Sequence, residues 1–94
     1  MSEDLAQRAV ACPGWRWLPG MQTLPLPTPD LPDLSDPATL GCVLALAREA
    51  WDDCEAFVGR RAGSWTFETL NPLAPLVTAS TEAAALVAAL EAAP

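Results

Sequence analysis

The side chains best suited to a chemical role lie in the run Trp15-Arg16-Trp17, just before the turn signal Pro19-Gly20. Tryptophan and arginine supply a large share of the binding energy at protein interfaces, so this run predicts a recognition surface. A structural reading competes with it, in which both indoles pack in the core of a strand and Arg16 pairs with a carboxylate outside. A third reading, stacking of the indoles on nucleic-acid bases, is disfavoured by the charge of the chain.

The three cysteines, Cys12, Cys42 and Cys54, are scattered along the chain, and histidine is absent. Zinc sites use four ligands, usually with close pairs of cysteines or histidines, and this spacing provides none. An odd number of irregularly spaced cysteines also argues against a disulfide framework. We therefore expect reduced thiols, with no metal and no cofactor.

Carboxylates are the remaining groups that could act in catalysis, and two clusters stand out, Asp30-Asp33-Asp36 and Asp52-Asp53-Glu55. Runs of like charge are typical of solvated faces. Without histidine the commonest general base near neutral pH is missing. No serine lies in a nucleophile elbow, and no glycine-rich loop precedes a helix to hold phosphates. We expect a protein that is not an enzyme.

The formal net charge is -7, and all five positive charges are arginines. Direct binding of nucleic acid needs clustered cations, so it is not expected, and an acidic surface favours a basic protein partner instead. No segment is long and apolar enough to cross a bilayer, and the acidic start of the chain differs from a signal peptide. The expected location is the cytoplasm of a bacterial host cell, away from membranes.

Periodicity and turn signals predict the elements that must position these groups. The first half of the chain is expected to form a helix over 2–11, a strand over 14–18 and a proline-rich extended strap over 23–37. A helix from Pro37 to about Trp51 follows, and then a hairpin around 61–63 that leads into a strand over 64–69. A loop over 71–75 and a last helix capped by 80–82 complete the order. Helices on one face of a small sheet bury their apolar stripes together. We expect one α+β domain over 1–94, with two to three antiparallel strands packed with three helices and the strap.

Large aromatic residues are few, so we expect all six to supply much of the core: Trp15, Trp17, Trp51, Trp65, Phe57 and Phe67. The helix after Pro37 is apolar on a second side as well, through Cys42 and Leu46, so it is either central in the fold or covered by a partner. The strap adds Leu26 and Leu31. The candidate partner-binding residues are Trp15, Arg16, Trp17, Leu26, Leu31, Cys42, Leu46, Asp52 and Asp53.

Three stretches resemble short uncharacterised proteins encoded by bacteriophages and prophages of GC-rich bacteria. The first contains a Trp-Arg-Trp-x-Pro-Gly-Met run, and the stretches cover residues 8–21, 36–51 and 81–91. The resemblance implies a phage or prophage origin and no particular activity.

We therefore expect a small acidic accessory protein that binds a host protein, a phage protein or a second copy of itself. One alternative is an anti-defence inhibitor of a CRISPR effector or a nuclease, in which acidic side chains imitate nucleic-acid phosphates. Another alternative is a component of the virion or of its assembly.

Overall fold

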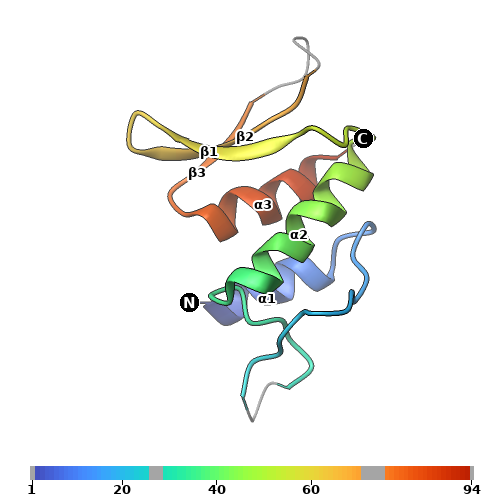
Figure 1. Ribbon diagram of the computed structural model, residues 1–94. Helices are drawn as coiled ribbons and strands as arrows, with labels where there is room; N and C mark the ends of the chain where they lie inside the picture. Colours follow the sequence, from blue (N-terminus) through green and yellow to red (C-terminus); the bar gives the residue numbers. More distant parts are fainter. Residues whose placement is uncertain (1, 26–28, 71–75, 94) are drawn as a thin grey trace.

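The computed structural model describes residues 2–25, 29–70 and 76–93. Within these ranges, three helices pack with one three-stranded antiparallel sheet, which confirms the predicted α+β class. The elements, shown in Figure 1, are α1 (Ser2–Val10), α2 (Pro37–Ala50), β1 (Phe57–Arg61), β2 (Ser64–Glu68), β3 (Val77–Ala79) and α3 (Glu82–Ala92).

The second and third helices begin at the capping residues that the sequence signals. At the start of α2 the Asp36 side chain accepts a hydrogen bond from the Thr39 amide at 2.9 Å, and Pro37 occupies the first turn, where its missing N–H costs nothing. At the start of α3 the Thr81 hydroxyl accepts a bond from the Ala84 amide at 3.0 Å. The predicted start of α2 is confirmed, and Thr81 is the cap of α3.

The sheet has the order β1-β2-β3. β1 and β2 are joined by Ala62 and Gly63, both with positive φ (53° and 83°), as expected for a two-residue turn that matches the twist of the strands. The hairpin predicted around residues 61–63 is therefore confirmed. β3 was not predicted, because three residues are too few to show an alternating pattern.

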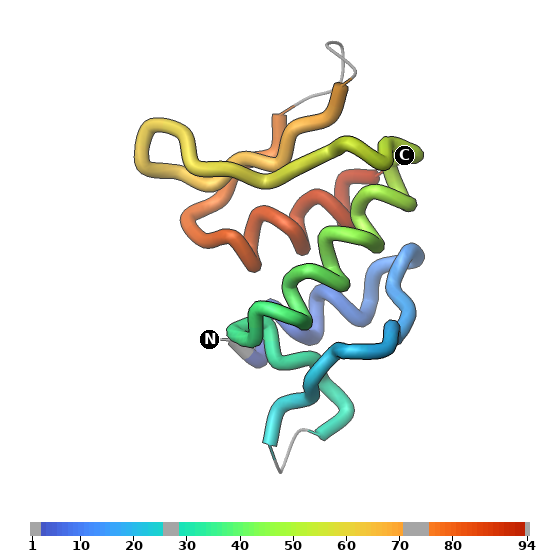
Figure 2. The backbone as a smooth tube through the Cα atoms, in the orientation of Figure 1, coloured from blue at the N-terminus to red at the C-terminus, as the bar shows by residue number. Residues whose placement is uncertain are grey.

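Helix α3 is the centre of the fold. It contacts α1, α2 and all three strands, and it lies between the sheet and the other two helices (Figures 1 and 2). A helix enclosed in this way must be apolar around its circumference, which its alanine-rich sequence provides. Its buried residues are Ala85, Leu86, Val87, Ala89 and Leu90.

The expected aromatic core is largely wrong. Of the six large aromatic side chains only Phe67 is fully buried, at 1% exposure, whereas Trp17 and Phe57 are 46% and 47% exposed. The remaining three, Trp15, Trp51 and Trp65, are half-buried. The core consists mainly of alanine, valine and leucine, because the alanines of α3 let neighbouring elements approach closely.

The strand expected over residues 14–18 is also wrong, since the structure assigns no strand to this segment. Its local bonds are those of turns. The Trp15 amide donates to the Cys12 carbonyl at 3.0 Å, and the Met21 amide donates to the Leu18 carbonyl at 3.2 Å. Alternating residue types predict a strand only where a neighbouring strand completes the ladder.

The proline-rich strap lies against the domain, as expected for its described part. Its two limbs pair with each other through the amides of Leu24 and Asp33, which donate to the carbonyls of Leu31 and Gln22 at 2.8 Å. Leu31 is buried at 6% exposure and belongs to the core. The predicted loop over 71–75 lies outside the described residues.

Candidate functional site

The two tryptophans of the N-terminal segment form an aromatic pair at the surface. Their ring centroids lie 5.4 Å apart, with an interplanar angle of 87°. This edge-to-face geometry is a favourable one for aromatic rings. Trp15 is half-buried and supports Trp17, whose exposure of 46% leaves nearly half of its side chain in contact with solvent. The reading that places both indoles in the core is therefore wrong for Trp17, whereas Trp15 packs against the core.

Arg16 fixes this segment to α2. Its Nη1 and Nη2 atoms donate to the two carboxylate oxygens of Glu49 at 2.5 and 2.6 Å. The hydrogen bonds from Arg16 lower the pKa of the Glu49 carboxyl below its usual value. A two-point contact of this kind restricts the orientation of both partners. The predicted pairing of Arg16 with a carboxylate is confirmed, and we call Trp15, Arg16, Trp17 and Glu49 the tryptophan patch.

A hollow of about 260 Å³ lies beside the tryptophan patch. Leu46, only 1% exposed, lies at its base. The indole Nε1 of Trp15 is buried without a hydrogen-bond partner among the described residues, which is an energetic cost to the fold. The lining residues are Pro13, Gly14, Trp15, Arg16, Leu46, Glu49 and Ala50.

Two leucines of the predicted partner-binding set are buried, so they are not available to a partner. Leu31 and Leu46 belong to the core, and Cys42 is half-buried, with its thiol 3.6 Å from the Pro19 carbonyl. The N-terminal segment of the chain thus covers part of the second apolar side of α2. Leu26 lies outside the described residues.

Asp52 and Asp53 follow α2 and have different surroundings. Asp53 links the turn after α2 to the end of β2. One of its carboxylate oxygens accepts a hydrogen bond from the Glu55 amide at 3.0 Å, and the other accepts one from the Leu70 amide at 2.7 Å. Asp52 is exposed and has a left-handed backbone conformation, with φ at 52°. Both residues line a second hollow, of about 490 Å³, together with Glu49. Because Glu49 lines both hollows, the structure brings Asp52 and Asp53 to the side of α2 that carries the tryptophan patch.

All five arginines contact other groups of the same chain. The contacts are the ion pairs Arg8–Glu91, Arg16–Glu49 and Arg61–Glu68, the bond from Arg48 Nε to the Ala56 carbonyl at 2.6 Å, and the placement of Arg60 over the Trp65 ring at 5.6 Å. With a net charge of -7, the charge not compensated within the chain is therefore carried by carboxylates.

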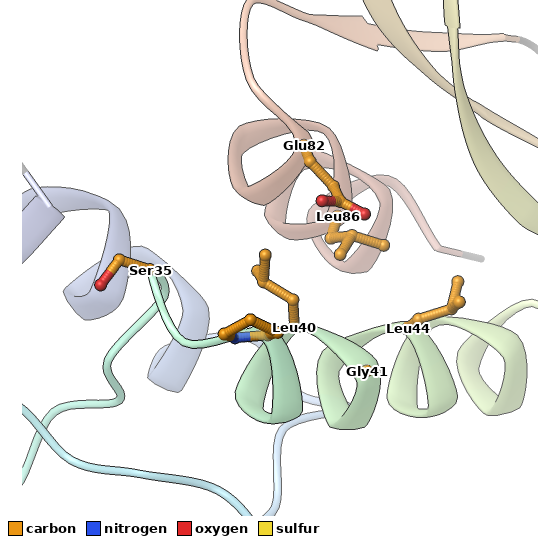
Figure 3. Close-up of a pocket in the computed structure, with 7 residues that line it drawn as sticks. Ser35, Leu40, Gly41, Leu44, Glu82 and Leu86 are labelled. Atoms are coloured by element: carbon orange, nitrogen blue, oxygen red, sulfur yellow. The ribbon is translucent and has the colours of Figure 1, made fainter.

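A groove lies between the N-terminal halves of α2 and α3. Figure 3 shows Leu40 and Leu44 of α2 on one side and Leu86 of α3 on the other, with the Glu82 carboxylate close to Leu86. The volume is about 410 Å³, and Ser35, Pro37 and Gly41 complete the lining. We call it the leucine groove. Leu86 belongs to the core, and Leu40 and Leu44 pack against it. Helical spacing alone does not show that the three side chains also border a groove.

The side chains that could bind a metal ion are dispersed over the part of the chain that the structure describes. Within residues 2–25, 29–70 and 76–93, no three histidine, cysteine, aspartate or glutamate side chains are grouped so as to hold a metal ion. Cys12 is 7% exposed, and burial raises the pKa of its thiol. The same ranges contain no helix with the length and apolar character needed to span a membrane.

Comparison of the chain with protein-family models, with curated proteins and with solved structures finds no match. The function must therefore be argued from the tryptophan patch, the leucine groove and the distribution of charge.

Proposed function

We propose that this protein is not an enzyme and acts by binding another protein through the tryptophan patch. The observation that carries the proposal is Trp17, a large aromatic side chain that is 46% exposed beside the edge-on ring of Trp15. Tryptophan is among the residues most often found at the energetic centre of an interface. A single exposed hydrophobic residue is common on protein surfaces, so the fixed surroundings of this residue are what matter.

Those surroundings restrict Trp17 before any partner arrives. The Arg16–Glu49 contact holds the segment to α2 on one side, and Trp15 supports the ring on the other. Binding costs less conformational entropy when an anchoring side chain is already ordered. The shallow hollow at Leu46 and Ala50 provides a place for a side chain of the partner next to the anchor.

The charge distribution favours a protein partner over nucleic acid. Arg16 is neutralised by Glu49, and the other four arginines have partners within the chain. Phosphate groups would therefore meet a protein with a net charge of -7, in which three of the five arginines are already paired with carboxylates. We extend the proposal to the setting expected from the sequence, an accessory protein of a phage or prophage with a host or phage protein as partner. Imitation of nucleic acid by the acidic cluster after α2 is less well supported, because Asp53 serves the local fold.

The test compares Trp17→Ala with Leu76→Ala in affinity capture from lysates of cells that encode the protein. Leu76 is 56% exposed, so its substitution removes a comparable apolar group outside the tryptophan patch. We expect one protein to be retained by the unaltered chain and by Leu76→Ala, and to be retained at least about tenfold less by Trp17→Ala. Circular dichroism confirms that both variants fold. Retention of the same proteins by all three chains would refute the proposal.

A further inference from the structure

The leucine groove has a wall that leaves room for another chain. Gly41 lines it from α2, and a Cβ atom added at this residue would meet no heavy atom within 4 Å. Leu40 and Leu44, on the same helix, are packed partly against the core, while Leu86 is buried at 1% exposure. The groove therefore lies between two helices, is lined by leucines together with polar groups, and has a gap where Gly41 has no side chain.

Among the described residues, Glu82 provides the only charged side chain that lines the leucine groove. It is half-buried at the first turn of α3, and among the described residues no ion pair involves it. None of the internal contacts of the five arginines involves Glu82, so its carboxylate is available to a cation from another molecule. The Glu82 carboxylate next to the leucines is complementary to a partner surface that carries a cation next to an aliphatic side chain.

The spacing of these groups matches one turn of a helix. Glu82 and Leu86 are four residues apart on α3, which places them about 6 Å apart along the helix axis. A lysine or arginine and an aliphatic residue four positions apart on a partner helix have the same separation. Amphipathic helices bind apolar grooves through anchors at this spacing.

We infer that the leucine groove binds a basic amphipathic helix of a protein partner. An aliphatic side chain of that helix enters between Leu40, Leu44 and Leu86, and a lysine or arginine one turn away pairs with Glu82. The inference rests on the proposed role in protein binding and adds a second surface to the tryptophan patch. A second copy of this chain is a poor occupant, because both copies carry a net charge of -7, which opposes self-association.

The probe is a synthetic amphipathic helix of leucine, alanine and lysine in which leucine and lysine lie four residues apart, added to the ¹⁵N-labelled protein. We expect saturable shifts of the amide signals of Gly41, Leu44 and Leu86, and none from a matched peptide with glutamate in place of lysine. Glu82→Gln should weaken binding of the lysine peptide about two- to fivefold, as expected for a partly exposed ion pair. The difference between Glu82→Gln and the unaltered chain should shrink in high salt.

Gly41→Leu separates binding in the groove from general attraction to an acidic protein. The new side chain fills the groove without changing the charge, and it replaces a helical glycine at an open position, so the fold should remain stable. We expect at least about tenfold weaker binding for Gly41→Leu. Ala92→Leu, an exposed position at the other end of α3, is the control and should bind normally.

Equal affinity of Gly41→Leu and the unaltered chain, or equal binding of the lysine and glutamate peptides, would overturn the inference. If the peptide does not bind the groove but Trp17→Ala still fails to capture its partner, the inference about the groove is wrong and the proposed function stands. The reverse pattern, a groove that binds the peptide and a Trp17→Ala variant that captures its partner normally, would refute the tryptophan patch alone.

Discussion

Trp51→Phe tests how the end of α2 is tied to the central helix. The Trp51 indole Nε1 donates to the Ala89 carbonyl at 2.8 Å, in the last turn of α3, where carbonyl groups run short of amide donors. Its ring also lies 6.1 Å from that of Phe67, the only fully buried aromatic side chain of the described residues. Phenylalanine keeps part of the ring contact and removes the hydrogen bond.

Two terms set the size of the effect. Loss of one hydrogen bond costs about 1 kcal/mol of net stability. The smaller ring buries less apolar surface, which adds up to about 1 kcal/mol at 25 cal/mol per Å². We expect the free energy of unfolding to fall by about 1 to 2 kcal/mol and the melting temperature to fall by roughly 4 to 16 °C, since each kcal/mol shifts a domain of this size by about 4 to 8 °C.

The assay is thermal and urea unfolding followed by circular dichroism, with Trp65→Phe as the matched control. Trp65 is also half-buried, but its ring faces the Arg60 guanidinium at the hairpin. The reasoning would be refuted if Trp51→Phe were no more destabilising than Trp65→Phe, because the bond to α3 would then contribute nothing.

Three further perturbations test other contacts. Ala62→Asn should raise the free energy of unfolding in urea by about 0.5 to 1 kcal/mol, since asparagine tolerates the left-handed conformation of this turn better than alanine, and an unchanged midpoint would contradict this. Arg8→Gln should lower stability at pH 7 by less than about 1 kcal/mol, because both side chains of the ion pair with Glu91 are exposed. The hydrogen bond from Arg8 lowers the pKa of Glu91, so the ion pair stabilises the fold at pH values above the ordinary carboxyl pKa of 4.5. The difference in stability between Arg8→Gln and the unaltered chain should therefore disappear as the pH falls below that value, and a difference that grows would contradict this. A thiol reagent should modify Cys54 rapidly and Cys12 only as fast as the protein opens, because Cys12 is buried with a raised pKa; equal rates would contradict the placement of Cys12.

Local signals in the sequence were enough to predict the helices and the hairpin. The cap at Asp36, the proline after it and the turn around 61–63 act over a few residues, so no knowledge of distant contacts was needed. The prediction of a strand over 14–18 was wrong because a strand depends on distant contacts that the local sequence does not show. A strand depends on its neighbour, and the segment instead packs along α2 through Arg16 and Glu49.

The distribution of the aromatic residues depended on α3 and could not be predicted. Because α3 presents alanine on most sides, the elements around it pack closely, and little space remains for indoles in the core. Trp17 is consequently at the surface, which the sequence offered only as one of three readings. The leucine groove was missed because it arises from the angle between two helices, and that angle is a tertiary property.

The most direct test of the central claim is site-specific photo-crosslinking in living cells that encode the protein. The photoreactive amino acid p-benzoylphenylalanine replaces Pro13 in one strain and Leu76 in another, and both positions are exposed. Pro13 lines the hollow beside the tryptophan patch, so Trp17 itself stays intact. We expect a discrete adduct of the protein with one other protein from position 13 and none of that mass from position 76. The absence of any adduct at position 13, or the same adducts from both positions, would contradict a role in protein binding through the tryptophan patch.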